Sequence, residues 1–174
     1  MLDSMINYPS GELRASNNWP YALAAGCVVY RKSPMGIEVL LLSKMQKTDP
    51  NSAGDNLHSY HLPKGHAKIG ETLETTAQRE TEEEAGCVVE IQTYLGSLHW
   101  KYVHSQYPHV FDKTVHSFLA LWKKDQGEMD QEHDARLWVP IQKAKQLLGA
   151  KSNPKGEDEL ISRAQTFFEL SDES

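Results

Sequence analysis

The order of apolar and polar positions predicts a series of β-strands with one helix in the middle of the chain. Alternation indicates a strand with one buried face, and short apolar runs bounded by turn residues indicate more deeply buried strands. Residues 31–36 contain Pro and Gly and join the first two strands as a hairpin, while residues 46–57 are polar and loop-like. Strands are expected at residues 21–30, 37–42, 59–62, 88–100 (one bent strand or two), 113–122 and 137–139.

Helices are expected at residues 75–85, 141–148 and 157–168. The first has no internal Gly or Pro and is followed by Gly86, which favours a left-handed cap. Pro140 is suited to open the second helix. Strands around a central helix, with helices at the end, predict an α/β fold in which a central mixed sheet lies in an α/β/α sandwich.

Three carboxylates share one face of the first helix. Glu80, Glu83 and Glu84 stand at positions i, i+3 and i+4, so they repel one another unless a cation offsets their charge. Mg²⁺ or Mn²⁺ accepts such oxygen ligands best. Arg79 is close enough to pair with Glu83. A solvated acidic face is the simpler alternative, but Gly65, Glu71 and Arg79 in register favour a metal site.

The segment Leu-Pro-Lys-Gly-His at residues 62–66 precedes this helix. Its Pro and its Lys-Gly pair are expected to end a strand and turn the chain sharply. Lys64 would suit a polyphosphate, or it is an ordinary surface lysine. His66 is a further candidate for contact with substrate.

Composition limits the classes of binding partner and the cellular location that we expect. A net charge of −6 and a pI near 5.7 argue against binding of duplex nucleic acid, and no apolar run predicts a membrane span. Cys27 and Cys87 are expected to pack rather than to bond, which favours the cytoplasm. The histidines show no zinc-ligand spacing. Residues 1–18 are expected to form a polar extension and residues 19–170 a single domain, with no obligate protein partner evident.

Residues 65–87 fit the pattern G-x5-E-x7-R-E-U-x-E-E-x-G-U, with Thr81 and Cys87 at two positions that are usually apolar. This pattern resembles the Nudix box of hydrolases that cleave a nucleoside diphosphate linked to another group. The resemblance implies the Nudix fold and adds the Gly65 carbonyl as a metal ligand. It also implies supporting roles for Gly65, Glu71 and Gly86.

Within that family, the chain looks like the diadenosine tetraphosphate hydrolase branch over residues 21–148, apart from an insert at residues 105–111. The resemblance rests on residues 62–66, 79–86 and 113–115, and on Glu132-His133 ahead of Trp138. It implies that Tyr102 stacks on an adenine. Lys101 and Lys113 would then contact phosphate, although Trp100 and Tyr102 would equally suit a core.

The mechanism expected from these residues is metal-dependent hydrolysis. Catalytic roles are expected for Glu80, Glu83, Arg79 and Glu132, with Glu83 the first choice as general base and Glu132 the second. The expected substrate is a small nucleotide, a bis(5′-nucleosyl) tetraphosphate cleaved to ATP and AMP. The alternatives are sanitising of nucleoside triphosphates, pyrophosphate removal from RNA 5′ ends, trimming of diphosphoinositol phosphates, and a nucleotide sensor that does not hydrolyse.

Overall fold

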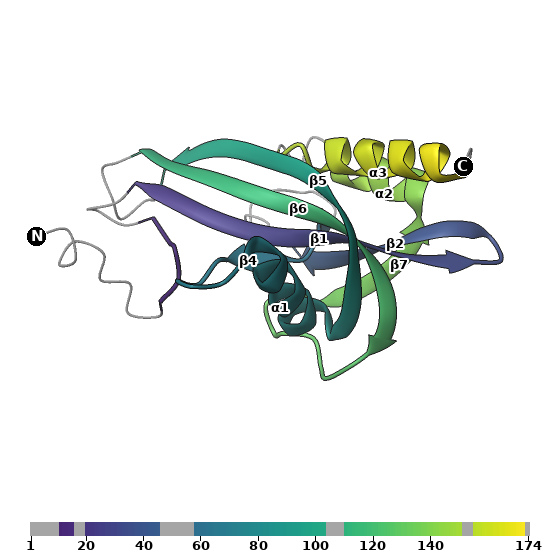
Figure 1. Cartoon of the computed structure of the whole chain (residues 1–174), viewed down its shortest axis with the longest axis horizontal. Coiled ribbons are helices and arrows are strands. Elements are labelled where there is room, and N and C mark those ends of the chain that lie inside the picture. Colours follow the sequence, from purple (N-terminus) through teal and green to yellow (C-terminus); the bar gives the residue numbers. More distant parts are fainter. Residues whose placement is uncertain (1–10, 16–19, 46–57, 104–109, 151–154, 173–174) are drawn as a thin grey trace, which may run out of the picture.

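The computed structural model describes residues 11–15, 20–45, 58–103, 110–150 and 155–172. All of its named strands belong to one sheet, and three helices lie against that sheet (Figure 1). In chain order the elements are β1 (Tyr21–Ser33), β2 (Gly36–Met45), β3 (His58–His61), β4 (Lys64–His66), α1 (Leu73–Ala85), β5 (Cys87–Val103), β6 (Val110–Asp125), β7 (Ala135–Pro140), α2 (Ile141–Leu148) and α3 (Glu157–Asp172).

The sheet is mixed, in the order β3-β2-β1-β6-β5, with β4 paired to β1 and β7 paired to β2. Strands β1 and β6 run parallel, whereas the other pairs are antiparallel. One edge of β1 has two partners, because residues 24–26 pair with β4 and residues 30–33 pair with β2. Gly26 lets β4 approach, since an added Cβ would overlap Pro63 and Lys64.

Alternate residues of the central strands pack into two separate cores, one on each face of the sheet. One core contains Val28, Leu41 and Leu119 together with residues of α2 and α3, and the other contains Val29 and Leu40 together with residues of α1. Figure 1 shows α2 and α3 on one side of the sheet and α1 on the other. Each fully buried Leu or Val contributes roughly 1.5–3 kcal/mol to folding. The predicted α/β/α sandwich on a mixed sheet is therefore confirmed.

Several boundaries differ from the prediction. Residues 64–66 form strand β4 rather than a sharp turn, because their backbone pairs with β1. Residues 88–100 form one bent strand, which was one of the two expected alternatives; the strand, β5, extends beyond both expected ends, and its register shifts at three places. Helix α1 begins two residues earlier than expected and α3 ends four residues later.

Other expectations concern the ends and loops of the chain. Cys27 and Cys87 are buried and free, as expected, and burial raises the pKa of Cys27 to about 12. Residues 11–15 belong to the expected extension, yet they bond to the domain: Leu13 donates its N–H to Ala67 and accepts one from Leu23. The expected loop at residues 46–57 and most of the insert at 105–111 lie outside the described residues, although Val110 and Phe111 belong to β6. No helix in the described part of the chain is long and apolar enough to cross a bilayer.

Candidate active site

Helix α1 begins and ends where its sequence supplies caps. The Thr72 hydroxyl accepts a hydrogen bond from the Thr75 N–H at 3.1 Å. Gly86 adopts the left-handed conformation, with φ at 61°, and its N–H donates to the Glu82 carbonyl. These caps satisfy backbone groups that a helix leaves unpaired at its ends. The register of the helix, and with it the direction of each glutamate, is therefore fixed locally.

Small residues hold α1 close to the sheet. Ala77, Thr81 and Ala85 are fully buried, and the Cys27 thiol of β1 donates to the Ala77 carbonyl at 3.6 Å. The position after Arg79 and Glu80 in the box is usually apolar. Thr81 occupies it here, Cys87 occupies a second usually apolar position after Gly86, and both are inaccessible to solvent. This packing leaves Glu80, Glu83 and Glu84 on the side of the helix that borders β4 and the cleft described below.

Arg79 joins the helix to the loop that precedes it. Its guanidinium donates to both Glu71 oxygens at 2.7 and 2.9 Å and to the His66 carbonyl at 3.0 Å. It also contacts Glu80 at 2.5 Å and Glu83 at 3.2 Å. We call this set the Arg79 network. The guanidinium holds the pKa of Glu71 down at about 2.

A cleft of about 470 Å³ opens beside α1 and β4. We call it the carboxylate cleft, because acidic side chains from α1 and from the segment before β7 dominate its lining. The lining residues are Glu12, Arg14, Lys64, Gly65, His66, Glu80, Glu83, Glu84, Lys113, Asp130 and Glu132.

The three α1 carboxylates enter this cleft in different environments. Glu80 is 8% exposed, and burial raises its pKa although Arg79 opposes the shift. Burial also raises the pKa of Glu84, to about 7, although the Lys64 N–H donates to its carboxylate at 2.9 Å. The Glu83 side chain is 54% exposed. Two partly buried acids are thus disfavoured in their charged form, which a cation in the cleft would reverse.

The close approach of β4 to α1 requires a glycine at position 65. An added Cβ there would overlap the Glu80 carboxylate. Gly65 therefore keeps that carboxylate next to the β4 backbone, where the resemblance also expects a carbonyl ligand.

Two residues beyond the predicted set extend the ligand group. The ligand atoms of Glu84, Asp130 and His133 all lie within 4.8 Å of one another. Asp130 also bonds His133 Nδ1 at 3.0 Å, which fixes the orientation of the ring. The carboxylates of α1 and Asp130 fit Mg²⁺ or Mn²⁺, and the His133 imidazole beside them favours Mn²⁺ slightly.

The structure brings Lys64, His66 and Lys113 to the cleft. The Lys64 ammonium lies 2.8 Å from Glu157 at the start of α3 and donates to the Leu62 carbonyl at 3.2 Å. Burial and the nearby Lys64 lower the pKa of Lys113 to about 8. Burial likewise lowers the pKa of His66 to about 4, so its imidazole is neutral at pH 7.

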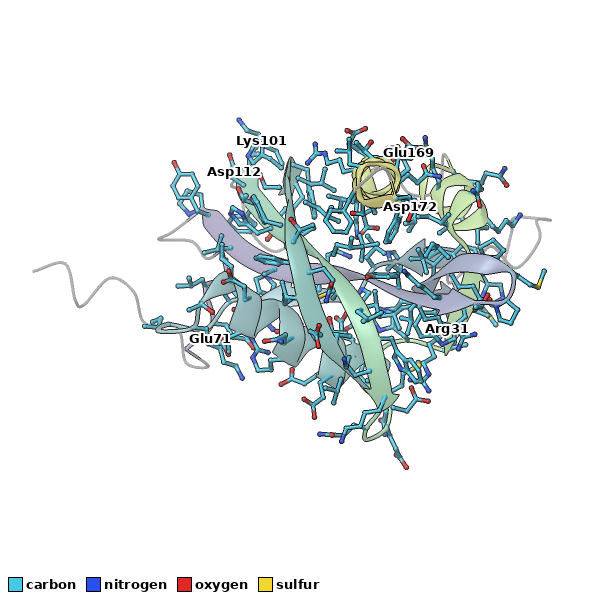
Figure 2. The ribbon with its side chains drawn as sticks, turned by 45° about the vertical axis from the view of Figure 1, so that its right-hand side comes forward. Arg31, Glu71, Lys101, Asp112, Glu169 and Asp172 are labelled. Carbon is cyan, nitrogen blue, oxygen red and sulfur yellow. The ribbon has the colours of Figure 1, made fainter. Side chains whose placement is uncertain are left out.

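The structure does not bring Lys101 or Tyr102 to the cleft lining. Lys101 is exposed near the end of β5 and stands opposite Asp112 of β6 (Figure 2). The Tyr102 ring is partly buried with its centroid 5.5 Å from that of Phe111. Their roles in substrate binding remain predictions.

Trp100 is the aromatic residue that lies beside a lysine of the cleft. It stands opposite Lys113 in the sheet, and the Lys113 ammonium lies 5.9 Å from the centroid of its ring. The bulged register of β5 decides this pairing, and local sequence gives no signal for that register.

Glu132 reaches the cleft from the segment between β6 and β7, as an exposed side chain 3.3 Å from Lys44. Sequence reasoning missed Glu12 and Arg14, which form an ion pair on the rim. They lie in the segment that was expected to be a mere extension, and its backbone bonds to residues 67–69 gave no sequence signal.

Comparisons with known proteins bear on this geometry. The family model described as NUDIX domain matches residues 20–161. The bis(5′-nucleosyl)-tetraphosphatase [asymmetrical] of Mus musculus is 34% identical over 134 residues, which cover 71% of this chain and 82% of that protein. Nudix hydrolase 21, chloroplastic, of Arabidopsis thaliana is 31% identical over 152 residues, which cover 83% of this chain and 68% of the relative.

Among solved structures, a C. elegans Ap4A hydrolase binary complex superposes with a TM-score of 0.57. The match covers 84% of this chain and 97% of that one at 24% identity. At this level of identity the likeness concerns the fold.

Proposed function

Because this chain belongs to the Nudix hydrolase family, we propose that its carboxylate cleft hydrolyses a bis(5′-nucleosyl) tetraphosphate to ATP and AMP with Mg²⁺ or Mn²⁺. The observation that supports this substrate is the position of Lys64 and Lys113 in the same cleft as Glu80, Glu83 and Glu84. Cations beside a carboxylate cluster suit a long phosphate chain. The identity to the mouse tetraphosphatase supports the same choice.

Glu80, Glu83 and Glu84 would hold the cation, with Asp130 and His133 beside them. When bound, the cation supplies positive charge to phosphate oxygens and makes water more acidic. Arg79 keeps Glu80 and Glu83 in place through the Arg79 network. The chain itself thus supplies a pre-organised acidic face, which costs no rearrangement during the reaction.

Glu83 takes the proton from the attacking water in this proposal. Of the three α1 glutamates in the cleft it is the most exposed to solvent, so water reaches it, and its link to Arg79 fixes its direction. Glu132 is the second choice as base, because it reaches the same cleft from another segment. Lys64 and Lys113 stabilise the negative charge of the phosphate chain during the reaction. The buried free cysteines support a cytoplasmic setting.

The test is the product pattern from diadenosine tetraphosphate in ¹⁸O-water, read by chromatography and mass spectrometry. We expect ATP and AMP in equal amounts, label in ATP, and no turnover in the presence of EDTA. Two ADP as the sole products, or faster turnover of an oxidised nucleoside triphosphate, would contradict the proposed substrate and favour sanitising.

A further inference from the structure

A second cavity adjoins the carboxylate cleft. It has a volume of about 290 Å³, and it shares Lys64, Glu84, Lys113 and Glu132 with the cleft. We call it the basic compartment. Its lining residues are Lys44, His61, Leu62, Lys64, Glu84, Lys113, Glu132, His133 and Lys155.

The two cavities have opposite polarity. Four lysines and two glutamates line the basic compartment, so its formal charge is positive when its histidines are neutral. The carboxylate cleft, in contrast, is lined by six carboxylates, three basic side chains and one histidine. A ligand that extends from the carboxylate cleft into the basic compartment would therefore meet cation-binding groups at one end and anion-binding groups at the other.

The lysines of the basic compartment are only partly neutralised. Lys64 pairs with Glu157, and Lys44 pairs with Glu132. Among the residues that the structure describes, neither Lys113 nor Lys155 forms an ion pair. Partly buried ammonium groups near one another are costly unless an anion joins them.

The pKa values agree with this geometry. Burial is the main cause that lowers the pKa of Lys155, and the neighbouring Lys64 lowers it further. His61 also faces the compartment, and burial lowers its pKa to about 4. It therefore stays neutral at pH 7 and offers a hydrogen bond without adding charge.

We infer that the basic compartment binds the phosphates of the substrate that lie beyond the reacting one, and that Lys155 and Lys44 thereby select substrates with long phosphate chains. This inference rests on the proposed function for the identity of the chain. Lys64 and Lys113, which line both cavities, would contact phosphates where the two cavities adjoin. Lys155 and Lys44 line only the basic compartment, so only a longer chain reaches them.

The test compares Lys155→Gln with the native protein on diadenosine tri-, tetra- and pentaphosphate. We expect KM to change little for the triphosphate and to rise about tenfold for the pentaphosphate, the size of one lost charged contact. Lys155→Arg should restore most of the affinity, because it keeps the charge. Lys143→Gln, which removes an exposed lysine of α2, is the matched control and should leave all three KM values unchanged.

A second measurement does not depend on turnover. Inorganic tripolyphosphate is titrated by calorimetry in EDTA, and we expect binding to the native protein that weakens about tenfold in Lys155→Gln and stays intact in Lys143→Gln. Tripolyphosphate binding that depends on Lys155 would support phosphate binding in the basic compartment even if no dinucleotide were cleaved. If the protein cleaves dinucleotides but Lys155→Gln changes KM equally at every chain length, the inferred role of the basic compartment is wrong and the proposed function still holds. A melting curve close to that of the native protein shows that each variant is folded.

Discussion

The Arg79 network and the basic compartment each include a residue of β4, but they differ in how their charges are paired. In the network, one guanidinium joins Glu71, Glu80 and Glu83 to the His66 carbonyl, so its cation is fully matched within the chain. In the basic compartment, Lys113 and Lys155 have no ion-pair partner among the described residues. Paired charges fix the local structure, whereas unpaired, partly buried charges are available to bind a ligand.

The largest effect should come from Glu83→Gln, which removes one charge from the side of the Arg79 network that faces the cleft. We expect kcat to fall at least ~10²-fold, because a base or an electrostatic stabiliser is lost. The melting temperature should hold or rise, because repulsion with Glu80 is relieved. Steady-state kinetics and thermal unfolding measure the two quantities.

Glu82→Gln is the control for this variant. Glu82 lies on the same helix but bonds to Gln126 away from the cleft. It should keep near-native kcat. Near-native Mg²⁺-dependent activity in Glu83→Gln would remove Glu83 from the catalytic set.

The variant Glu71→Gln tests the contribution of the Arg79 network to stability. This variant should lower the free energy of unfolding by ~1–2 kcal/mol at pH 7, because charge-assisted hydrogen bonds to Arg79 are weakened. The folded pKa of about 2 lies below the ordinary 4.5, so the native protein holds this stability above pH 4.5. The advantage should shrink as the pH falls from 4.5 to about 2.

Urea unfolding of both proteins at several pH values measures this difference. Glu74→Gln, which removes an exposed acid from the first turn of the same helix, is the control and should show a smaller loss. A difference between native protein and Glu71→Gln that stays constant from pH 7 to pH 2 would show that Arg79 does not set the energy of Glu71.

The smallest effect concerns Trp100 and Tyr102, two aromatic residues of β5. Trp100→Leu should raise KM for diadenosine tetraphosphate about threefold, because it removes a ring next to Lys113 and a stacking surface. Tyr102→Leu should change KM less, because Tyr102 packs on Phe111 and does not line the cleft. Leucine keeps apolar packing in both variants, and melting curves check their stability. A larger KM change for Tyr102→Leu would assign the stacking role to Tyr102, as the resemblance implies.

The parts of the site that the sequence predicted are those determined by local structure. The spacing of Glu80, Glu83 and Glu84 on one helix, the cap at Gly86 and the reach of Arg79 follow from helical geometry alone. For the same reason, the bounds of α2 were predicted correctly from Pro140 and the apolar positions after it. Strand β4 was missed because its pairing partner, β1, lies about forty residues away in the chain.

The remaining parts depend on contacts between distant segments. Asp130 lines the carboxylate cleft, Lys155 lines the basic compartment, and Glu157 pairs with Lys64 of β4. These positions depend on how the segment before β7 and the residues at the start of α3 pack, far in sequence from β4. The choice between Trp100 and Tyr102 depends on the register of β5 against β6, which three shifts along the strand determine. Neither the contacts between distant segments nor the register of a strand can be predicted from a short stretch of sequence.

The pair formed by Lys64 and Glu157 has a consequence for biosynthesis. A ribosome releases β4 and α1 well before it has made α3, and domains begin to fold during synthesis. Until α3 docks, a nascent chain presents its glutamates while Lys64 still lacks its acidic neighbour. The Lys64–Glu157 pair therefore forms only after a segment that is translated well after β4 and α1 has docked.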